Sequence, residues 1–211
     1  MRGHILIIAD GRSPTARSWI ETVRAIGYDV SLVSTFACEP MQGLKHFHIL
    51  PIAFSRLSAN KASGKTSSNK GVLKALVKRF APKFQTLRYF IGPLTLNQNA
   101  KAYQRLLQEV QPDLVHALRI PFEGMLGSTT PEKLPFIAAT WGNDLTLHAK
   151  GSYLMRRLTH RCLTRANGLT SDTLRDIRLA HDWGLAPAAP TLKVPGSGGI
   201  DPDIIRHAKD F

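Results

Sequence analysis

The sequence predicts a single α/β domain with a doubly wound, mainly parallel sheet. Short apolar runs alternate along the chain with segments whose apolar residues recur at helical spacing. The runs are apolar on both faces, as in strands that helices cover from two sides. A chain of 211 residues is long enough to bury a large core, and no Pro/Gly-rich linker divides it before residue 195.

The first predicted unit is a strand, a helix and a second strand. Residues 4–9 are an apolar run that ends at an Asp-Gly pair. A helix is expected from about Pro14, because Ser13 suits the N-cap and proline is tolerated in the first helical turn. Gly27 should end this helix, and residues 28–34 form the next strand.

The middle of the chain contains a third strand and two helices. We expect the strand at 47–52, closed by Pro51, and a loop at 55–71, which is rich in Ser, Lys, Asn and Gly. Helical spacing predicts one helix over 72–84 and a longer one over about 94–110.

The second half repeats the alternation. Strands are expected at 113–116, 136–140, 168–171 and 191–194. A helix should join the first two of these strands, and others should cover about 152–165 and the residues up to 183. We expect the domain to span 1–195 and residues 196–211 to begin an interdomain linker.

Polar residues follow the central strands, where an open parallel sheet binds ligands. His116 ends one strand, and Trp141-Gly142-Asn143-Asp144 follows the next. Arg119 and Glu123 lie one helical turn apart and could either form an ion pair or face a polar ligand. The tetrapeptide could equally be a turn with an N-cap, and a lone His is more often structural than catalytic.

Several other patterns point to no site. Gly64-Lys65-Thr66 lacks the preceding glycine and strand of a phosphate-binding loop. His46 and His48 share a strand face without an evident third ligand, so we expect no metal. Two cysteines, Cys38 and Cys162, match no metal spacing and fit small buried thiols in a reducing compartment. No cofactor is expected.

The basic charge is concentrated in one segment. The net charge is +13, and residues 40–108 contain twelve Lys or Arg and no Asp or Glu. Lys70, Lys74 and Lys78 form a stripe along the helix predicted at 72–84. This stripe could be a solvated face, a contact with an anionic membrane surface, or, with less support, a nucleic-acid contact.

The chain is expected to be cytoplasmic. No apolar run approaches the roughly 20 residues of a membrane span. The N-terminal run is too short for a signal peptide and has no cleavage site. The basic stripe adds the option of peripheral contact with the inner face of the membrane.

Four motifs occur in an order that resembles a known family. They are Pro112-Asp-Leu-Val-His-Ala117, Trp141-Gly-Asn-Asp144, Ala166-Asn-Gly-Leu-Thr-Ser171 and Val194-Pro-Gly-Ser-Gly-Gly-Ile-Asp201. This order resembles the N-terminal, acceptor-side domain of the group 1 (family 4) retaining glycosyltransferases. The resemblance covers nearly the whole chain and implies one Rossmann-like half of the two-domain GT-B fold.

The resemblance also implies roles for particular residues. Gly11, Arg12 and Ser13 would lie near the phosphates of a nucleotide-sugar, the co-substrate of the complete enzyme. The acceptor, a glycan, lipid or small molecule, would contact a separate set of residues, and no catalytic residue is assigned. That acceptor-side set is His116, Arg119, Glu123, Trp141, Gly142, Asn143 and Asp144.

Some residues depart from the family's pattern. Leu118 and Trp141 replace two histidines, and Gly198 replaces an asparagine. The donor-binding C-terminal domain of the family is absent from these 211 residues. The resemblance therefore implies an incomplete enzyme: a truncated chain, one half of a split enzyme, or a domain that has lost catalysis. A nucleic-acid-binding or receiver-like signalling module is the alternative function.

Overall fold

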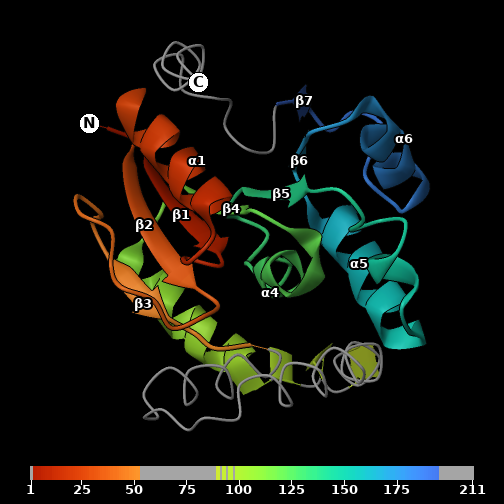
Figure 1. Ribbon diagram of the computed structural model, residues 1–211, viewed down its shortest axis with the longest axis horizontal. Helices are drawn as coiled ribbons and strands as arrows, with labels where there is room; N and C mark the ends of the chain where they lie inside the picture. Colours follow the sequence, from red (N-terminus) through yellow and green to blue (C-terminus); the bar gives the residue numbers. More distant parts are fainter. Residues whose placement is uncertain (1, 53–88, 91, 94, 97, 195–211) are drawn as a thin grey trace, which may run out of the picture.

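The computed structural model describes residues 2–52, 89–90, 92–93, 95–96 and 98–194. Within them, seven strands form one sheet in the order β3-β2-β1-β4-β5-β6-β7, and every neighbouring pair is parallel (Figure 1). The predicted doubly wound α/β fold is therefore confirmed. The strands are β1 His4–Ala9, β2 Asp29–Ser34, β3 Phe47–Ile49, β4 Leu114–Ala117, β5 Phe136–Thr140, β6 Gly168–Ser171 and β7 Thr191–Lys193.

The strand order reverses between β1 and β4. From β1 the chain moves outward to β2 and β3, then returns to β4 on the other side of β1 and moves outward to β7. The segments that follow β1 and β4 therefore leave the sheet in opposite directions. In open α/β sheets, this divergence at the carboxyl ends creates the crevice that binds ligands.

Two buried clusters cover the two faces of the sheet. Ile5 and Ile7 of β1 pack on the face covered by α1 (Pro14–Ala25). Leu6 and Ile8 pack on the opposite face, together with residues of the helix over 98–110 and of α5 (Tyr153–Arg165). β1 is buried along its whole length because both of its faces are covered.

The ends of α1 confirm the predicted capping. Ser13 Oγ accepts a hydrogen bond from the Ala16 amide, and proline occupies the first turn. Gly27 follows the C-cap with φ of 101°, and its amide donates to the Arg24 carbonyl. This left-handed position favours glycine, so a local sequence signal ends the helix.

Several other elements match their predicted ranges closely. α5 begins after its N-cap Ser152, and α6 covers Leu174–Asp182 with Thr173 as its N-cap. β3 is shorter than predicted, because regular pairing with β2 ends at Ile49. The helix predicted over 94–110 is continuous over 98–110 among the described residues.

The prediction of a regular helix between β4 and β5 is wrong. The chain forms a distorted turn, η1 (Ile120–Gly124), and a single helical turn, α4 (Met125–Gly127). Pro121 is extended and Phe122 has φ of 69° with ψ of −57°, so helical geometry is interrupted. A positive φ in a phenylalanine is sterically costly and persists only where the surroundings impose it.

Some sequence-based predictions lie outside the described residues. They include the loop 55–71, the helix 72–84 with Lys70, Lys74 and Lys78, and the linker 196–211. Within the described part of the chain, no helix has the length and apolar character needed to span a bilayer.

Candidate functional site

A buried carboxylate and a half-exposed guanidinium meet beyond β4 and β5. Asp144 is 1% exposed, and its Oδ1 accepts hydrogen bonds from Arg119 Nη2 at 2.6 Å and Nε at 3.2 Å. The Arg119 side chain is 41% exposed. Because Arg119 follows β4 and Asp144 follows β5, the pair bridges neighbouring strands at the ligand-binding edge of the sheet.

Trp141, Gly142, Asn143 and Asp144 form a turn. The Trp141 amide donates to Asp144 Oδ2 at 3.1 Å, and Gly142 adopts φ of 54°. Gly142 and Asn143 are exposed. Both carboxylate oxygens of Asp144 accept hydrogen bonds from within the chain, as expected of a residue that holds a turn. Gly142 and Asn143 remain accessible to a ligand.

Charge around Arg119 involves a second carboxylate. Burial opposes the positive charge of Arg119, but its attraction and hydrogen bonds to Asp144, together with Glu123, leave its pKa raised. Glu123 is buried, and its Oε1 accepts from Thr35 Oγ1 at 2.7 Å. Thr35 directly follows β2, so this bond spans the point where the strand order reverses.

His116 lies beneath this edge and not in the open. It is 5% exposed, its Nε2 lies 3.2 Å from Thr170 Oγ1, and the Trp19 ring packs edge-on at 5.6 Å. Burial lowers the pKa of His116 to about 4. The imidazole is therefore neutral near pH 7, and it can accept or donate one hydrogen bond without adding charge.

A narrow hollow is lined by Trp19 and Thr170, which both contact His116, and by Asp172, which the sequence did not single out. Within the described residues, Trp19 Nε1 and Asp172 Oδ1 are buried and have no hydrogen-bond partner. A donor and an acceptor of this kind suit a water molecule, and the hollow, of about 10 Å³, has room for no more than one. Its lining residues are Trp19, Leu118, Ala139, Trp141, Thr170, Ser171, Asp172 and Val194.

Arg175 is another residue that sequence reasoning missed. Its Nη2 donates to the Gly142 carbonyl at 3.1 Å, and its Nε donates to Asp176 Oδ1 at 2.9 Å. Arg175 thus connects the first turn of α6 to the exposed part of the tetrapeptide. No local signal pointed to this contact, because the partners are 33 residues apart.

The loop after β1 is closely packed at Gly11. A Cβ at this position would lie 2.6 Å from Cys38 Sγ and 2.8 Å from Ser34 Oγ. The Gly11 amide donates to Ser34 Oγ at 3.0 Å. The close approach explains the glycine by packing, independently of any ligand.

The Asp10 carboxylate already binds the Arg12 side chain of the same loop. Its carboxylate accepts from the Arg12 amide, Nε and Nη2 at 2.9–3.0 Å, and its carbonyl accepts from the Ser13 amide. The Arg12 guanidinium also lies 3.7 Å from the centre of the Phe36 ring. A donor phosphate at Gly11, Arg12 and Ser13 would therefore compete with Asp10.

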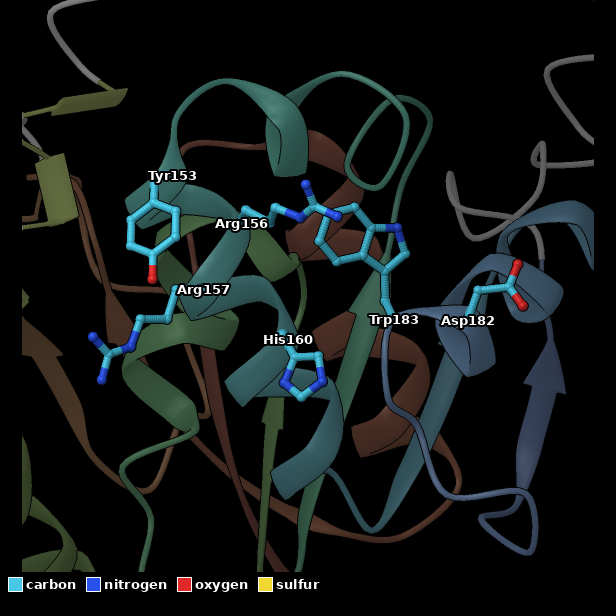
Figure 2. A pocket seen from close by; sticks show the side chains of 6 residues that line it. All are labelled: Tyr153, Arg156, Arg157, His160, Asp182 and Trp183. Carbon is cyan, nitrogen blue, oxygen red and sulfur yellow. The ribbon is translucent and has the colours of Figure 1, made fainter.

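A larger open pocket of about 520 Å³ lies on the surface of α5 and the end of α6. Figure 2 shows Arg156 reaching toward the Trp183 ring, with Tyr153 and Arg157 on the other side of His160. The Arg156 guanidinium lies 5.8 Å from the centre of that ring. The pocket is basic and aromatic, with Asp182 as its acidic lining residue.

Comparison with protein families gives a match over part of the chain. The model described as glycosyl transferase 4-like matches residues 83–173, a range that includes β4, β5, β6 and the Arg119–Asp144 pair. This part of the chain is therefore similar to a glycosyltransferase 4-like domain. No curated protein sequence is significantly similar to it.

Solved structures share the fold of this chain. A UDP-glucosyltransferase from Polygonum tinctorium has a TM-score of 0.55 at 8% identity, over 98% of this chain and 55% of its own. A UDP-N-acetylglucosamine 2-epimerase from Rickettsia bellii has a TM-score of 0.54 at 9% identity, over 100% of this chain and 48% of its own. The chain therefore spans about half the length of the structures it resembles, as expected of one half of a GT-B fold.

These neighbours define the fold without defining the reaction. One is named as a sugar transferase and the other as a sugar epimerase, although both match the same sheet. The family match over residues 83–173 supports a glycosyltransferase domain and does not favour the nucleic-acid or signalling alternatives.

Proposed function

We propose that the glycosyltransferase 4-like domain forms the acceptor-side wall of a cleft, and that a second domain or chain supplies the nucleotide-sugar. The complete enzyme would transfer a sugar to a glycan, lipid or small-molecule acceptor. The two structural neighbours described above have UDP-linked names and about twice the matched length, which supports a UDP-sugar and a second domain or chain that completes the cleft.

The observation that carries the proposal is the half-exposed guanidinium of Arg119 at the carboxyl edge of the sheet. Asp144 binds Nε and Nη2 of Arg119 from the buried side, while 41% of the side chain remains exposed. A planar guanidinium fixed in this way can donate further hydrogen bonds to acceptor hydroxyl or phosphate oxygens without losing side-chain entropy. Exposed Gly142 and Asn143 border the same edge.

The buried hollow complements this edge. Trp141 lines it, together with Trp19 and Asp172, which contribute a donor and an acceptor that have no hydrogen-bond partner among the described residues. Neutral His116 below keeps positive charge out of this part of the cleft. We assign no general base, since the charged groups that would act on the leaving phosphate belong to the missing half.

The test measures glycan binding and turnover separately. The isolated chain should release no UDP from UDP-glucose or UDP-N-acetylglucosamine in the presence of a glycan or lipid extract; multiple turnovers would contradict the half-enzyme proposal.

On a glycan array, Arg119→Lys should lose signal because lysine keeps the charge but not the planar fork. Arg178→Gln, an exposed arginine of α6, is the matched control. Equal glycan binding by the Arg119→Lys variant would refute the role of Arg119.

An anionic membrane surface is a second proposed partner. α5 contains no Asp or Glu and exposes Arg156, Arg157 and Arg161, next to the 79% exposed Tyr153. Tyr89, which lies within the basic segment of residues 40–108, contacts the start of α5 through the Ser152 hydroxyl and the His148 ring. Tyr89 therefore lies beside a basic, aromatic surface, and the combination of basic and aromatic side chains favours anionic lipid.

Vesicle binding tests this partner. Arg156→Gln/Arg157→Gln and Lys70→Gln/Lys74→Gln/Lys78→Gln variants should each bind phosphatidylglycerol vesicles less tightly than the unmodified chain. Phosphatidylcholine vesicles and Arg178→Gln serve as lipid and protein controls. Equal binding of every variant to anionic vesicles would refute the membrane proposal without affecting the glycan result.

A further inference from the structure

Two histidines and a glutamate gather at the β3 edge of the sheet, away from the carboxyl-edge site. Their ligand atoms all lie within 4.8 Å of one another, and the residues are His46, His48 and Glu109. The sequence pattern suggested only the two histidines. Glu109 comes from the last turn of the helix over 98–110, which Figure 1 shows in yellow-green beside orange β3.

Backbone pairing orients both imidazoles toward the same face. His46 precedes β3 and His48 lies within it, so side chains two residues apart project in the same direction. The two rings stack with centroids 6.4 Å apart and an interplanar angle of 13°. Hydrogen bonds hold the strand: the Leu32 amide donates to the His46 carbonyl, and the His46 amide donates to Ser31 Oγ.

The helix places Glu109 opposite these rings. Leu107 and Val110, on either side of it, are buried in the core, which fixes the helix against the sheet. The Glu109 side chain itself is 61% exposed and can adjust its rotamer. Its Oε1 lies 3.9 Å from His48 Nε2, which is too long for a hydrogen bond.

His48 Nε2 has an unmet bonding requirement. This atom is inaccessible to solvent and has no hydrogen-bond partner among the described residues. Buried polar atoms are normally paired, so an unpaired imidazole nitrogen aimed at a carboxylate and a second imidazole calls for an explanation. The adjacent cation, Lys45, is directed to Asp29, with Nζ and Oδ2 3.9 Å apart.

We propose that His46, His48 and Glu109 bind a divalent transition-metal ion, with zinc as the best-fitting cation. Imidazole nitrogen and carboxylate oxygen are established zinc ligands, and donor atoms in a tetrahedral site lie about 3.4 Å apart. His48 Nε2 and Glu109 Oε1 are 3.9 Å apart, close to that value, and the exposed Glu109 side chain can adjust its rotamer toward a bound ion. Three protein ligands leave a fourth position for water on the exposed side.

The metal would tie the edge strand to the crossover helix. His48 and Glu109 flank the long connection that leaves β3 and returns to β4, and this connection includes most of the basic segment. Metal binding to a site that exists only in the folded chain stabilises that fold. The proposed role is to stabilise this edge of the sheet, and its test does not depend on sugar transfer.

Zinc binding by the tag-free, metal-stripped chain tests the site. Isothermal titration should give one zinc ion per chain and a zinc-dependent rise in Tm, and cobalt should show the visible absorption of a tetrahedral centre. Glu109→Gln and His46→Gln/His48→Gln should each weaken zinc binding by at least about 100-fold, more than loss of an outer-shell contact.

Matched variants separate this site from adventitious binding. Glu132→Gln and His160→Gln change an exposed glutamate and an exposed histidine elsewhere, and they should bind zinc as the unmodified chain does. Because Glu109 is exposed, its substitution should leave the metal-free Tm unchanged. Absence of one-to-one zinc binding, or an unchanged affinity in Glu109→Gln, would overturn the proposal.

Discussion

Asp144 and Arg119 are unequally buried, although they form one ion pair. Asp144 is 1% exposed and the Arg119 side chain is 41% exposed, with Oδ1 and Nη2 2.6 Å apart. Removing the arginine leaves a buried carboxylate whose only hydrogen-bond donor among the described residues is the Trp141 amide, which bonds to its other oxygen. Removing the aspartate leaves a cation that water can reach.

Arg119→Ala should therefore destabilise the chain more than Asp144→Ala. We expect about 3–5 kcal/mol for the uncompensated buried carboxylate, and about 2 kcal/mol for loss of the aspartate. Urea denaturation of both single variants and of the double variant measures the two costs and their coupling. If the two single variants lost the same free energy of unfolding, or if their losses added in the double variant, the unequal burial of Asp144 and Arg119 would not determine their stabilities.

His116 should make the fold sensitive to acid. Burial lowers its pKa to about 4, against about 6.5 in the unfolded chain, so the unfolded state binds more protons between these values. The contribution of His116 to the free energy of unfolding is therefore fully present above about pH 6.5 and is lost as the pH decreases toward 4. The loss from this residue is on the order of 3 kcal/mol at most.

The His116→Gln variant isolates this effect, since glutamine can retain a hydrogen bond to Thr170. Its free energy of unfolding should fall less between pH 7 and pH 4.5 than that of the unmodified chain. The His160→Gln control should fall as the unmodified chain does. Parallel curves for the His116→Gln variant and the unmodified chain would contradict the neutral buried imidazole.

Asp10 should weaken anion binding at the β1–α1 loop. Asp10→Asn removes a negative charge that holds the Arg12 guanidinium and frees this group for a phosphate. Affinity for pyrophosphate should rise about fivefold, the scale of one exposed ion pair. Titration followed by NMR shifts of Gly11, Arg12 and Ser13 checks this, and Asp10→Asn/Arg12→Ala should abolish the gain. Unchanged affinity in Asp10→Asn would argue against a phosphate site in this loop.

Two glycines should respond differently to alanine. Gly11→Ala places a Cβ against Cys38 and Ser34 and should cost about 1–3 kcal/mol, part of which Cys38→Ala recovers. Gly142→Ala meets nothing within 4 Å, but its φ of 54° should cost about 1 kcal/mol, which no neighbouring substitution recovers. Thermal denaturation of the three variants measures these differences; full tolerance at Gly11 would contradict the packing explanation.

The candidate site was predictable only in part. The strand ends at His116 and Thr140 follow from apolar runs, so the sequence correctly located the carboxyl edge. It did not predict that Arg119 pairs with Asp144, since the expected helical partner of Arg119 was Glu123. That expectation assumed a regular helix, which Pro121 and Phe122 interrupt.

The sequence by itself determined the features that depend on neighbouring residues: the strand and helix order, the Ser13 cap and the Gly27 stop. Only the tertiary structure decided which distant groups meet. Asp144 with Arg119, Thr35 with Glu123, and His48 with Glu109 are 25, 88 and 61 residues apart. Parallel pairing and helix packing bring these groups together, and the resulting burial determines whether His116 is charged and whether Asp144 is accessible.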